Sequence, residues 1–332
     1  MQKVLIIQTA FIGDVVLSTA LIEKIAAYYP SVKIDFLLRK GNEGLLKNNP
    51  HIDEVLIWDK KKKKYKNLFS LLKVIRSKKY DKVINVQRYF TTGMLTGLSG
   101  AKEKIGFNKN PLSFLFDIKV KHDFDLKNPR HEVEKNNALI QHFTDNKKNK
   151  PALYPTTADY DLIKDYTQAP FITMTPSSVW FTKQYPTEKW IELIDQINPT
   201  YSIYLLGGPS NTRECEDLKS KCKNINIQIL TGKLSFLQSA ALMQSAVMNY
   251  TNDSAPLHFA SAVNAAVTAI FCSTIPAFGY TPLSDRSFIM ETKEHLSCRP
   301  CGLHGKKSCP EKHFKCGTTI ETDSLLKVID NN

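Results

Sequence analysis

Strand-like and helical segments alternate in two successive series along this chain, and this alternation constrains the fold more than any other feature. The first series opens with a buried-strand pattern at 3–8, and a helix with an apolar period follows from Gly13 to about Tyr29. Further strand-like runs lie at 33–38, 54–58 and 82–86, and further helices are predicted at 65–76 and 128–143. Because alternating strands and helices favour a parallel, doubly wound sheet, we expect ligands at the carboxyl ends of the strands.

A polar segment with two prolines, 144–163, predicts a linker before the second series. Strand-like runs then lie at 170–174, 201–206, 225–230, 246–249 and 267–271, with helices predicted at 187–198, 211–222 and 235–243. Because 332 residues are long for one hydrophobic core, we expect two α/β, Rossmann-like domains facing a cleft. The predicted domains are 1–155 and 156–317, followed by a C-terminal helix in 318–332 that packs back across the domain boundary.

The first half of the chain carries its whole excess of positive charge. Residues 1–150 contain 29 Lys and Arg against 15 Asp and Glu, whereas residues 151–332 contain 16 against 17. Such a basic domain indicates an anionic partner: nucleic acid, an anionic membrane surface or a phosphorylated substrate. The run Lys60–Lys64 with Lys66 is also typical of a solvated loop. Since no motif of specific nucleic-acid recognition accompanies it, a phosphorylated glycolipid at a membrane surface fits better.

The sequence predicts a cytoplasmic protein. Its start, MQKVLIIQ, has one lysine and a strand-like run rather than the pattern of a signal peptide. Its longest apolar runs fall short of the ~20 residues that a helix needs to cross a bilayer.

Four of the seven cysteines form a cluster with the spacing C-x2-C-x7-C-x6-C, at Cys298, Cys301, Cys309 and Cys316. In a reducing compartment such a cluster favours a metal or free thiols over disulfides. Two interpretations stay open: a structural zinc site, although the spacing matches no standard finger, and reduced thiols in a packed C-terminal loop. A catalytic zinc is not expected, because no water-activating carboxylate accompanies the cluster.

The loop Thr9–Asp14 follows the first predicted strand, at the edge of the sheet where ligands bind. It has a single glycine, so the dinucleotide-binding fingerprint is absent. Asp14 lies just inside the predicted helix. Its carboxylate either complements the helix dipole or acts as a general base that takes a proton from an incoming hydroxyl.

The second half offers a set of groups suited to a nucleoside diphosphate. Ser177 and Ser178 carry hydroxyls and Lys183 an ammonium, which suits a diphosphate that gains charge as it leaves, although a lone lysine is also a common surface residue. Glu214 follows the turn Gly207–Gly208, and a carboxylate there can accept hydrogen bonds from ribose hydroxyls. This signal is weak when taken alone.

The stretch Asn249–Ala262, NYTNDSAPLHFASA, leads from an apolar run into a helix of small residues. Its first turn would carry Ser254, Ala255 and Pro256, with Asp253 as the N-cap. The free N–H groups of this turn could bind a phosphate, although the same residues also make an ordinary well-capped helix start.

Taken together, these motifs resemble glycosyltransferase family nine, the ADP-heptose:lipopolysaccharide heptosyltransferases. The resemblance covers almost the whole chain. It rests on KVLIIQTAFIGDVVLSTALIEKI, YDKVINVQ, KIGF and RHEVEKN in the first half, and on TPSSVWFTKQYPTEKW, LLGGPSNTRE, NDSAPLHFASA and CRPCGLHGKKSCPEKHFKC in the second. Three positions depart from the usual pattern: Ala20 replaces a proline, Tyr185 follows the key lysine, and Ala255 replaces a glycine.

The resemblance implies a GT-B fold and an inverting transfer that needs no metal. Asp14 matches the catalytic base and Lys183 the lysine that stabilises the departing nucleotide diphosphate. The donor-binding residues that it implies are Ser177, Ser178, Glu214, Asp253, Ser254, Ala255 and His258, with Glu216 as a competitor for the role of Glu214. We assign acceptor binding to the basic residues Arg88 and Lys64.

We therefore expect a glycosyltransferase that moves a sugar, heptose by resemblance, from an ADP-sugar to an anionic glycolipid of the lipopolysaccharide type. It would contact the inner face of the cytoplasmic membrane peripherally and recognise no specific nucleic acid. Two alternatives stay open at this point: a GT-B transferase or epimerase that uses a UDP-sugar, and a non-catalytic protein that binds anionic surfaces.

Overall fold

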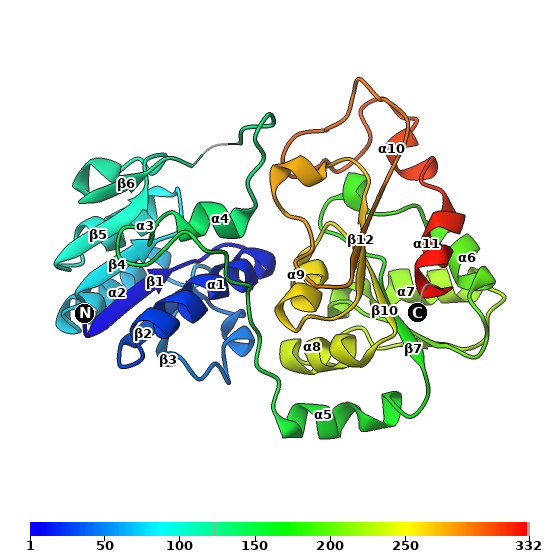
Figure 1. Cartoon of the computed structure of the whole chain (residues 1–332), viewed down its shortest axis with the longest axis horizontal. Coiled ribbons are helices and arrows are strands. Elements are labelled where there is room, and N and C mark those ends of the chain that lie inside the picture. Colours follow the sequence, from blue (N-terminus) through cyan, green and yellow to red (C-terminus); the bar gives the residue numbers. More distant parts are fainter. Residues whose placement is uncertain (123, 331–332) are drawn as a thin grey trace. The chain divides into compact units, whose positions relative to one another are not determined.

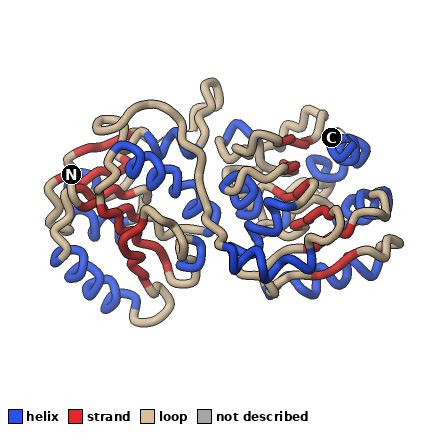
Figure 2. Tube along the Cα trace, turned by 60° about the horizontal axis from the view of Figure 1, so that its bottom comes forward, coloured by secondary structure: helices blue, strands red, loops and turns tan. Residues whose placement is uncertain are grey.

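The computed structural model describes residues 1–122 and 124–330, and the chain divides into two units, Met1–Tyr154 and Pro155–Asn332. The division lies one residue from the predicted boundary. Figure 1 shows the chain coloured from its N-terminus to its C-terminus. In Figure 2 helices lie alongside the strands of each unit, as expected for α/β domains.

The first unit is built on a six-stranded parallel sheet with the order β3-β2-β1-β4-β5-β6. Apolar residues of β1 pack against Leu68, Leu71 and Ile75 of α2 in its core. The strands are β1 (Lys3–Ile7), β2 (Lys33–Arg39), β3 (Ile52–Trp58), β4 (Lys82–Asn85), β5 (Glu103–Phe107) and β6 (Ile118–Val120). The helices are α1 (Ile12–Tyr28), α2 (Lys64–Ser77), α3 (Phe90–Gly97) and α4 (Glu132–Asn137).

The second unit has a six-stranded parallel sheet with the order β12-β11-β10-β7-β8-β9. Its strands are β7 (Phe171–Thr175), β8 (Ser202–Leu205), β9 (Ile227–Ile229), β10 (Met248–Asn252), β11 (Val267–Phe271) and β12 (Ser287–Glu291). Its helices are α5 (Thr157–Ile163), α6 (Thr187–Gln196), α7 (Thr212–Lys221), α8 (Phe236–Ser245), α9 (Ala255–Ala262), α10 (Lys315–Thr318) and α11 (Thr322–Asp330). Part of the predicted linker is therefore helical, since α5 lies inside 144–163.

Both sheets reverse their strand order next to their first strand. In the first unit the reversal lies between β1 and β4, and in the second it lies between β7 and β10. Each unit therefore has the strand order of a Rossmann fold, although the two halves share no sequence repeat. Ligands of such sheets bind where the order reverses, outside the carboxyl ends of the strands. The loops that follow β1, β4, β7 and β10 are thus the places to look for a site.

The C-terminal helix α11 packs against elements of the second unit, and its predicted packing back across the domain boundary stays a prediction. Leu325, Val328 and Ile329 are buried in the core of that unit, and α11 lies against α6 and β12. Tyr250 of β10 donates a hydrogen bond from its hydroxyl to the carbonyl oxygen of Leu325 over 2.7 Å. The apolar side of the helix is thus covered by its own unit.

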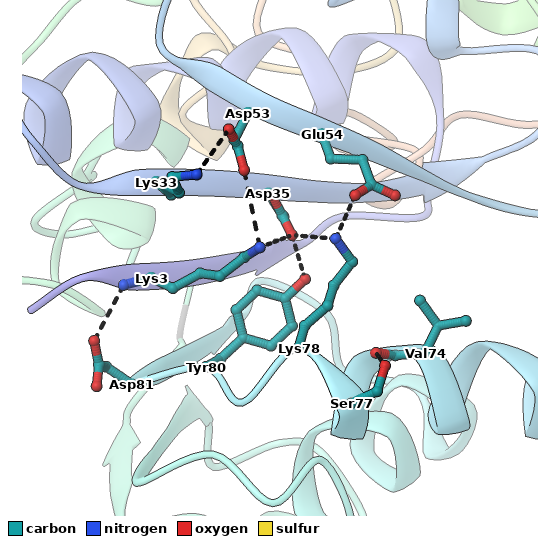
Figure 3. Close-up of polar contacts among 10 residues, drawn as sticks. All are labelled: Lys3, Lys33, Asp35, Asp53, Glu54, Val74, Ser77, Lys78, Tyr80 and Asp81. Atoms are coloured by element: carbon teal, nitrogen blue, oxygen red, sulfur yellow. Dashed lines mark hydrogen bonds and ion pairs between the residues drawn. The ribbon is translucent and has the colours of Figure 1, made fainter.

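A buried carboxylate joins the amino ends of the strands in the first unit (Figure 3). Asp35 of β2 is fully buried, and its Oδ2 accepts a hydrogen bond from the Tyr80 hydroxyl over 2.5 Å. The ammonium groups of Lys3 and Lys78 lie 3.3 and 3.2 Å from the same oxygen. Lys3 also lies 3.8 Å from the more exposed Asp53. Two cations and a hydroxyl therefore compensate one buried negative charge.

Candidate active site

Asp14 lies in the first turn of α1, directly after the loop that follows β1. The backbone N–H of Phe11, the N-cap residue, donates a hydrogen bond to Asp14 Oδ2 over 3.2 Å. Burial, and then the negative charge of Glu132, raise the pKa of Asp14 to about 6, against the lowering effect of the Phe11 N–H. A carboxylate whose pKa lies near neutrality is suited to general base catalysis.

Glu132 is the buried acidic neighbour of Asp14 and belongs to the motif RHEVEKN. It is the first residue of α4, which packs against α1, and it is 8% exposed. Its Oε1 lies 3.2 Å from Nε2 of His122, and its Oε2 lies 3.5 Å from the ammonium of Lys135. Burial works to raise the pKa of Glu132, but His122 and Lys135 outweigh it, so the pKa is lowered. Glu132 therefore stays negatively charged beside Asp14.

A lysine side chain, that of Lys60, contacts the same loop of the first unit. The ammonium of Lys60 donates hydrogen bonds to the carbonyl oxygen and the hydroxyl of Thr9 over 2.8 and 3.0 Å. Burial, and then the charges of Arg39 and Lys64, lower the pKa of Lys60 to about 8. Lys64, the first residue of α2, is exposed, and so is Arg88 in the loop after β4. Lys60 therefore contacts the loop that carries Asp14, whereas Lys61, Lys62, Lys63, Lys64 and Lys66 are exposed.

Lys183 and Asp253 form an ion pair at the switch point of the second unit. Lys183 ends a short 3-10 helix, η4 (Phe181–Lys183), and its ammonium lies 2.7 Å from Asp253 Oδ2. The hydroxyl of Thr274 donates to the same oxygen over 2.6 Å. Because its carboxylate is engaged in this way, Asp253 is not the N-cap of α9 as predicted; the N-cap is Ser254. The ion pair therefore fixes the position of the Lys183 ammonium, which lies at the end of a flexible side chain.

Ser177 and Glu214 are joined directly, which favours Glu214 over Glu216. The hydroxyl of the buried Ser177, after β7, donates to Oε2 of Glu214 in α7 over 2.7 Å. The side-chain amide of Gln184 donates to the carbonyl oxygen of Ser178 over 2.8 Å. These contacts gather the loop after β7, the segment of Lys183 and the start of α7.

The first turn of α9 follows β10 and is partly exposed at Ser254 and Ala255. The Ser254 hydroxyl makes no capping hydrogen bond to the N–H groups of this turn. His258 lies one turn further along, is 4% exposed, and has its ring 6.3 Å from that of Tyr280. The structure therefore places Ser254 and Ala255 at the accessible end of the helix and His258 inside the unit.

Comparison with known proteins assigns the chain to a family. Residues 68–314 match the model of glycosyltransferase family 9 (heptosyltransferase), which covers well over half of the chain. The chain belongs to glycosyltransferase family 9. It is similar to lipopolysaccharide heptosyltransferase 3 of Escherichia coli, with 27% identity over 277 residues that cover 80% of this chain and 82% of that protein.

Solved structures of this family share the fold. A glycosyl transferase family 9 protein from Veillonella parvula gives a TM-score of 0.85 at 20% identity, covering 99% of this chain and 96% of that one. The ADP-heptose lps heptosyltransferase II of E. coli gives 0.82 at 19% identity, covering 99% and 98%. The predicted GT-B architecture of two Rossmann-like domains is confirmed. The family 9 assignment also makes the chain a glycosyltransferase, which excludes the non-catalytic alternative.

In this family 9 enzyme the four clustered cysteines line one cavity together with His313. The Sγ of Cys298 lies 4.0 Å from Nε2 of His313, and burial raises the pKa of Cys316 to about 12. Within residues 1–122 and 124–330, no three or more His, Cys, Asp and Glu side chains are arranged to hold a metal ion. Both interpretations of the cluster, a structural zinc site and reduced thiols, stay predictions.

Sequence reasoning did not find several residues that shape the site of this glycosyltransferase. The side-chain amide of the buried Asn252 donates to the carbonyl oxygen of Pro176 over 2.7 Å, and its oxygen accepts from the N–H of Tyr185 over 2.9 Å. Thr274 donates a hydrogen bond to Asp253, and, after burial, the charge of Glu132 raises the pKa of Asp14. The sequence offered a signal for two of these residues, because both lie in motifs that carry the family resemblance: Asn252 precedes Asp253, and Glu132 lies in RHEVEKN. No motif pointed to Thr274.

Proposed function

We propose that this glycosyltransferase transfers heptose from ADP-heptose, with inversion, to an anionic glycolipid of the lipopolysaccharide type. The observation that carries the proposal is the ion pair of Lys183 with Asp253 next to the partly exposed first turn of α9. A diphosphate bound there would meet a cation and free backbone N–H groups. The donor named in a solved relative, ADP-heptose lps heptosyltransferase II, supports the choice of nucleotide sugar.

In this proposal Asp14 removes the proton from the attacking hydroxyl of the acceptor. The acceptor oxygen forms a bond to the anomeric carbon while the bond from that carbon to the phosphate oxygen breaks, and attack from the opposite side inverts the configuration. The proton remains on Asp14, and the electron pair leaves with ADP. Lys183 stabilises the negative charge that develops on the departing diphosphate.

In this proposal the other donor-side residues contact different parts of the nucleotide sugar. Glu214, oriented by Ser177, accepts hydrogen bonds from the ribose hydroxyls, and Ser178 lies in the same loop. Ser254 and Ala255 present backbone N–H groups to phosphate, and Asp253 contacts sugar hydroxyls. His258 supports the first turn of α9 from inside the unit.

Thermal-shift measurements with ADP, UDP and GDP test the nucleotide. A ligand that binds only the folded state raises the melting temperature by mass action. We expect ADP to raise it and UDP and GDP to have no effect at equal concentration, and we expect Lys183→Ala to weaken the ADP shift. A larger shift with UDP would instead favour a transferase or epimerase that uses a UDP-sugar.

The acceptor side of the proposal uses the basic surface of the first unit at an anionic membrane. Among the described residues, no helix has the length and apolarity needed to cross a bilayer. We propose that the contact is peripheral. The outer side of α2 carries Tyr65 and Phe69, which are 66% and 57% exposed, among exposed lysines that include Lys64 and Lys66. Aromatic and basic side chains on one helix face fit an anionic lipid interface. Lys64 and Arg88 would bind the anionic acceptor.

Vesicle co-sedimentation tests this surface. The double variant Tyr65→Ser/Phe69→Ser should lower binding to vesicles that contain phosphatidylglycerol by roughly 10-fold, because two apolar side chains no longer enter the interface. Binding to phosphatidylcholine vesicles should be weak for both proteins. Ile225→Ser removes an apolar side chain of the second unit that is 88% exposed and should change nothing. Equal loss with Ile225→Ser would contradict the assignment to α2.

A structural zinc at Cys298, Cys301, Cys309 and Cys316 remains a separate proposal. Their lining of one cavity supports it, whereas the absence of an assembled ligand set among the described residues does not. The proposed transfer uses no metal. Elemental analysis of the purified protein tests the site: one zinc per chain would support it, and none would leave the thiols free.

A further inference from the structure

The loop that carries the cysteines, 298–316, touches the segment that carries Lys183. We propose that this loop, which we call the cysteine loop, positions the ammonium of Lys183 through the contacts of Gly305 and Lys306 with Thr182. The inference rests on the proposed function, because it assigns these residues to the seating of the group that meets the departing diphosphate.

Thr182, the residue before Lys183, is held by the cysteine loop on two sides. It is 1% exposed. Its hydroxyl oxygen accepts a hydrogen bond from the Lys306 N–H over 2.7 Å, and its own N–H donates to the Lys306 carbonyl oxygen over 3.1 Å. The hydroxyl of Ser273 donates to the same Thr182 hydroxyl oxygen over 2.9 Å. The backbone at Lys183 is therefore fixed through its neighbour Thr182 by residues 91 and 124 positions away in the sequence.

Gly305 lies against the stem of Lys183 itself. A β-carbon at this position would lie 3.0 Å from Cγ of Lys183 and 3.0 Å from the hydroxyl oxygen of Thr182. The backbone of Gly305 has a φ of +76°, a conformation that L side chains rarely adopt. Only glycine lets the loop approach this closely without displacing the lysine.

The cysteine loop also supports Asp253, the partner of Lys183. The guanidinium of Arg299 donates to the carbonyl oxygens of Cys272 and Thr274, each over 2.7 Å. The N–H of Cys301 donates to the Ser273 carbonyl oxygen over 2.9 Å. Thr274 in turn donates its hydroxyl to Asp253. One loop thus supports the segments on both sides of the ion pair.

The contacts of the cysteine loop with Thr182 and Lys183 can hold the Lys183 ammonium where a transferase needs it. A lysine has a flexible stem of four carbons, so its ammonium reaches a fixed place only if its surroundings hold it there. Displacing a catalytic group by about 1 Å can cost roughly 100-fold in rate. A rigid contact at Cγ of Lys183 removes freedom from the part of the stem nearest the backbone. Thr182 and Gly305 are therefore positioning residues, and Lys183 is the group that meets the diphosphate.

The chain offers a matched pair of variants for the test. Gly302 lies in the same loop at a φ of +86°, but a β-carbon there would meet nothing within 4 Å. Both Gly302→Ala and Gly305→Ala place an L side chain at a positive φ, so the backbone strain is similar. Only the new β-carbon of Gly305→Ala would contact Lys183 and Thr182 closely. We expect Gly305→Ala to lower kcat for heptosyl transfer by roughly 10- to 100-fold, with KM for the donor changed by less than about threefold. We expect Gly302→Ala to keep kcat within about twofold of wild type.

Thr182 provides a second variant that does not depend on backbone strain. Thr182→Val removes the hydroxyl that Lys306 and Ser273 bond, whereas Thr182→Ser keeps it. We expect Thr182→Val to lower kcat and Thr182→Ser to restore it, with both variants folded by circular dichroism. Equal kcat for Gly305→Ala and Gly302→Ala, or for Thr182→Val and Thr182→Ser, would overturn the inference. If Lys183→Ala itself left kcat unchanged, the proposed function of Lys183 would fail instead.

Discussion

Replacing Asp14 by asparagine is expected to lower the transfer rate by roughly 10²- to 10⁴-fold, the usual contribution of a general base. The amide cannot take the proton from the acceptor hydroxyl, but its oxygen can still accept the hydrogen bond from the Phe11 N–H. The start of α1 should therefore keep its structure. ADP binding should also be unchanged, because the proposed donor site lies in the second unit. Steady-state kinetics and ADP titration measure both, and a variant that still turns over would remove Asp14 from the mechanism.

The pH dependence of transfer provides an independent check on this base. With the pKa of Asp14 raised to about 6, kcat/KM should rise with pH through that value as the carboxylate loses its proton. Glu132→Gln removes the negative charge that helps to raise this pKa, so the acidic limb should move to lower pH. Glu134→Gln changes a carboxylate of the same helix that pairs with Lys148 over 3.0 Å, and we expect it to leave the limb in place. Identical profiles for the two variants would contradict the role of Glu132.

The sign of the accompanying stability effect follows from linkage. Asp14 has a folded-state pKa of about 6 against an ordinary value of 3.8, so the folded state binds its proton more tightly than the unfolded state. Between these two values stability falls as the pH rises, and above pH 6 the full cost is present. Asp14→Asn should therefore raise the melting temperature at pH 7.5 and change it little at pH 3.5.

Replacing Asp35 by alanine is expected to destabilise the first unit by about 3–5 kcal/mol, the usual cost of removing one partner from a buried charge cluster. The ammonium groups of Lys3 and Lys78 and the hydroxyl of Tyr80 would lose their shared partner. Urea unfolding followed by tryptophan fluorescence measures the change, since Trp58 lies in the core of this unit.

Asp53→Ala is the matched control for Asp35→Ala. Asp53 pairs with Lys3 and Lys33 over 3.8 and 3.9 Å at the surface, where such pairs contribute about 0–1 kcal/mol. Figure 3 labels both carboxylates and draws the ion pair of each with Lys3. A loss with Asp53→Ala as large as that with Asp35→Ala would show that burial is not the source of the effect.

The sequence allowed the two α/β series to be predicted because their central strands are continuous apolar runs that end in polar loops. Short elements were missed: α3, β6 and β12 have few residues or mixed burial, so their periodicity is weak. The direction of α11 could not be predicted, because an amphipathic pattern shows that a face is buried but not which unit covers it.

The same limit applied to the site. Asp14, Lys183 and Glu214 follow strands or open helices, so local patterns pointed to them. The pairing of Lys183 with Asp253, the bond from Lys60 to Thr9 and the approach of Gly305 join residues distant in the sequence. No local spacing records such contacts. The roles proposed for these residues stay predictions until the variants are measured.

The position of Asp35 and its partners Lys3, Lys78 and Tyr80 has a practical consequence for engineering. Lys3, Asp35 and Tyr80 gather where the strands of the first sheet begin, whereas Asp14 and Lys60 lie where they end. The fold thus places the buried Asp35 ion pairs at one edge of the sheet and the proposed catalytic base at the other. We therefore expect stabilising substitutions at the first edge to combine additively with substitutions that alter acceptor binding at the second, because these two sets of described residues share no contacts.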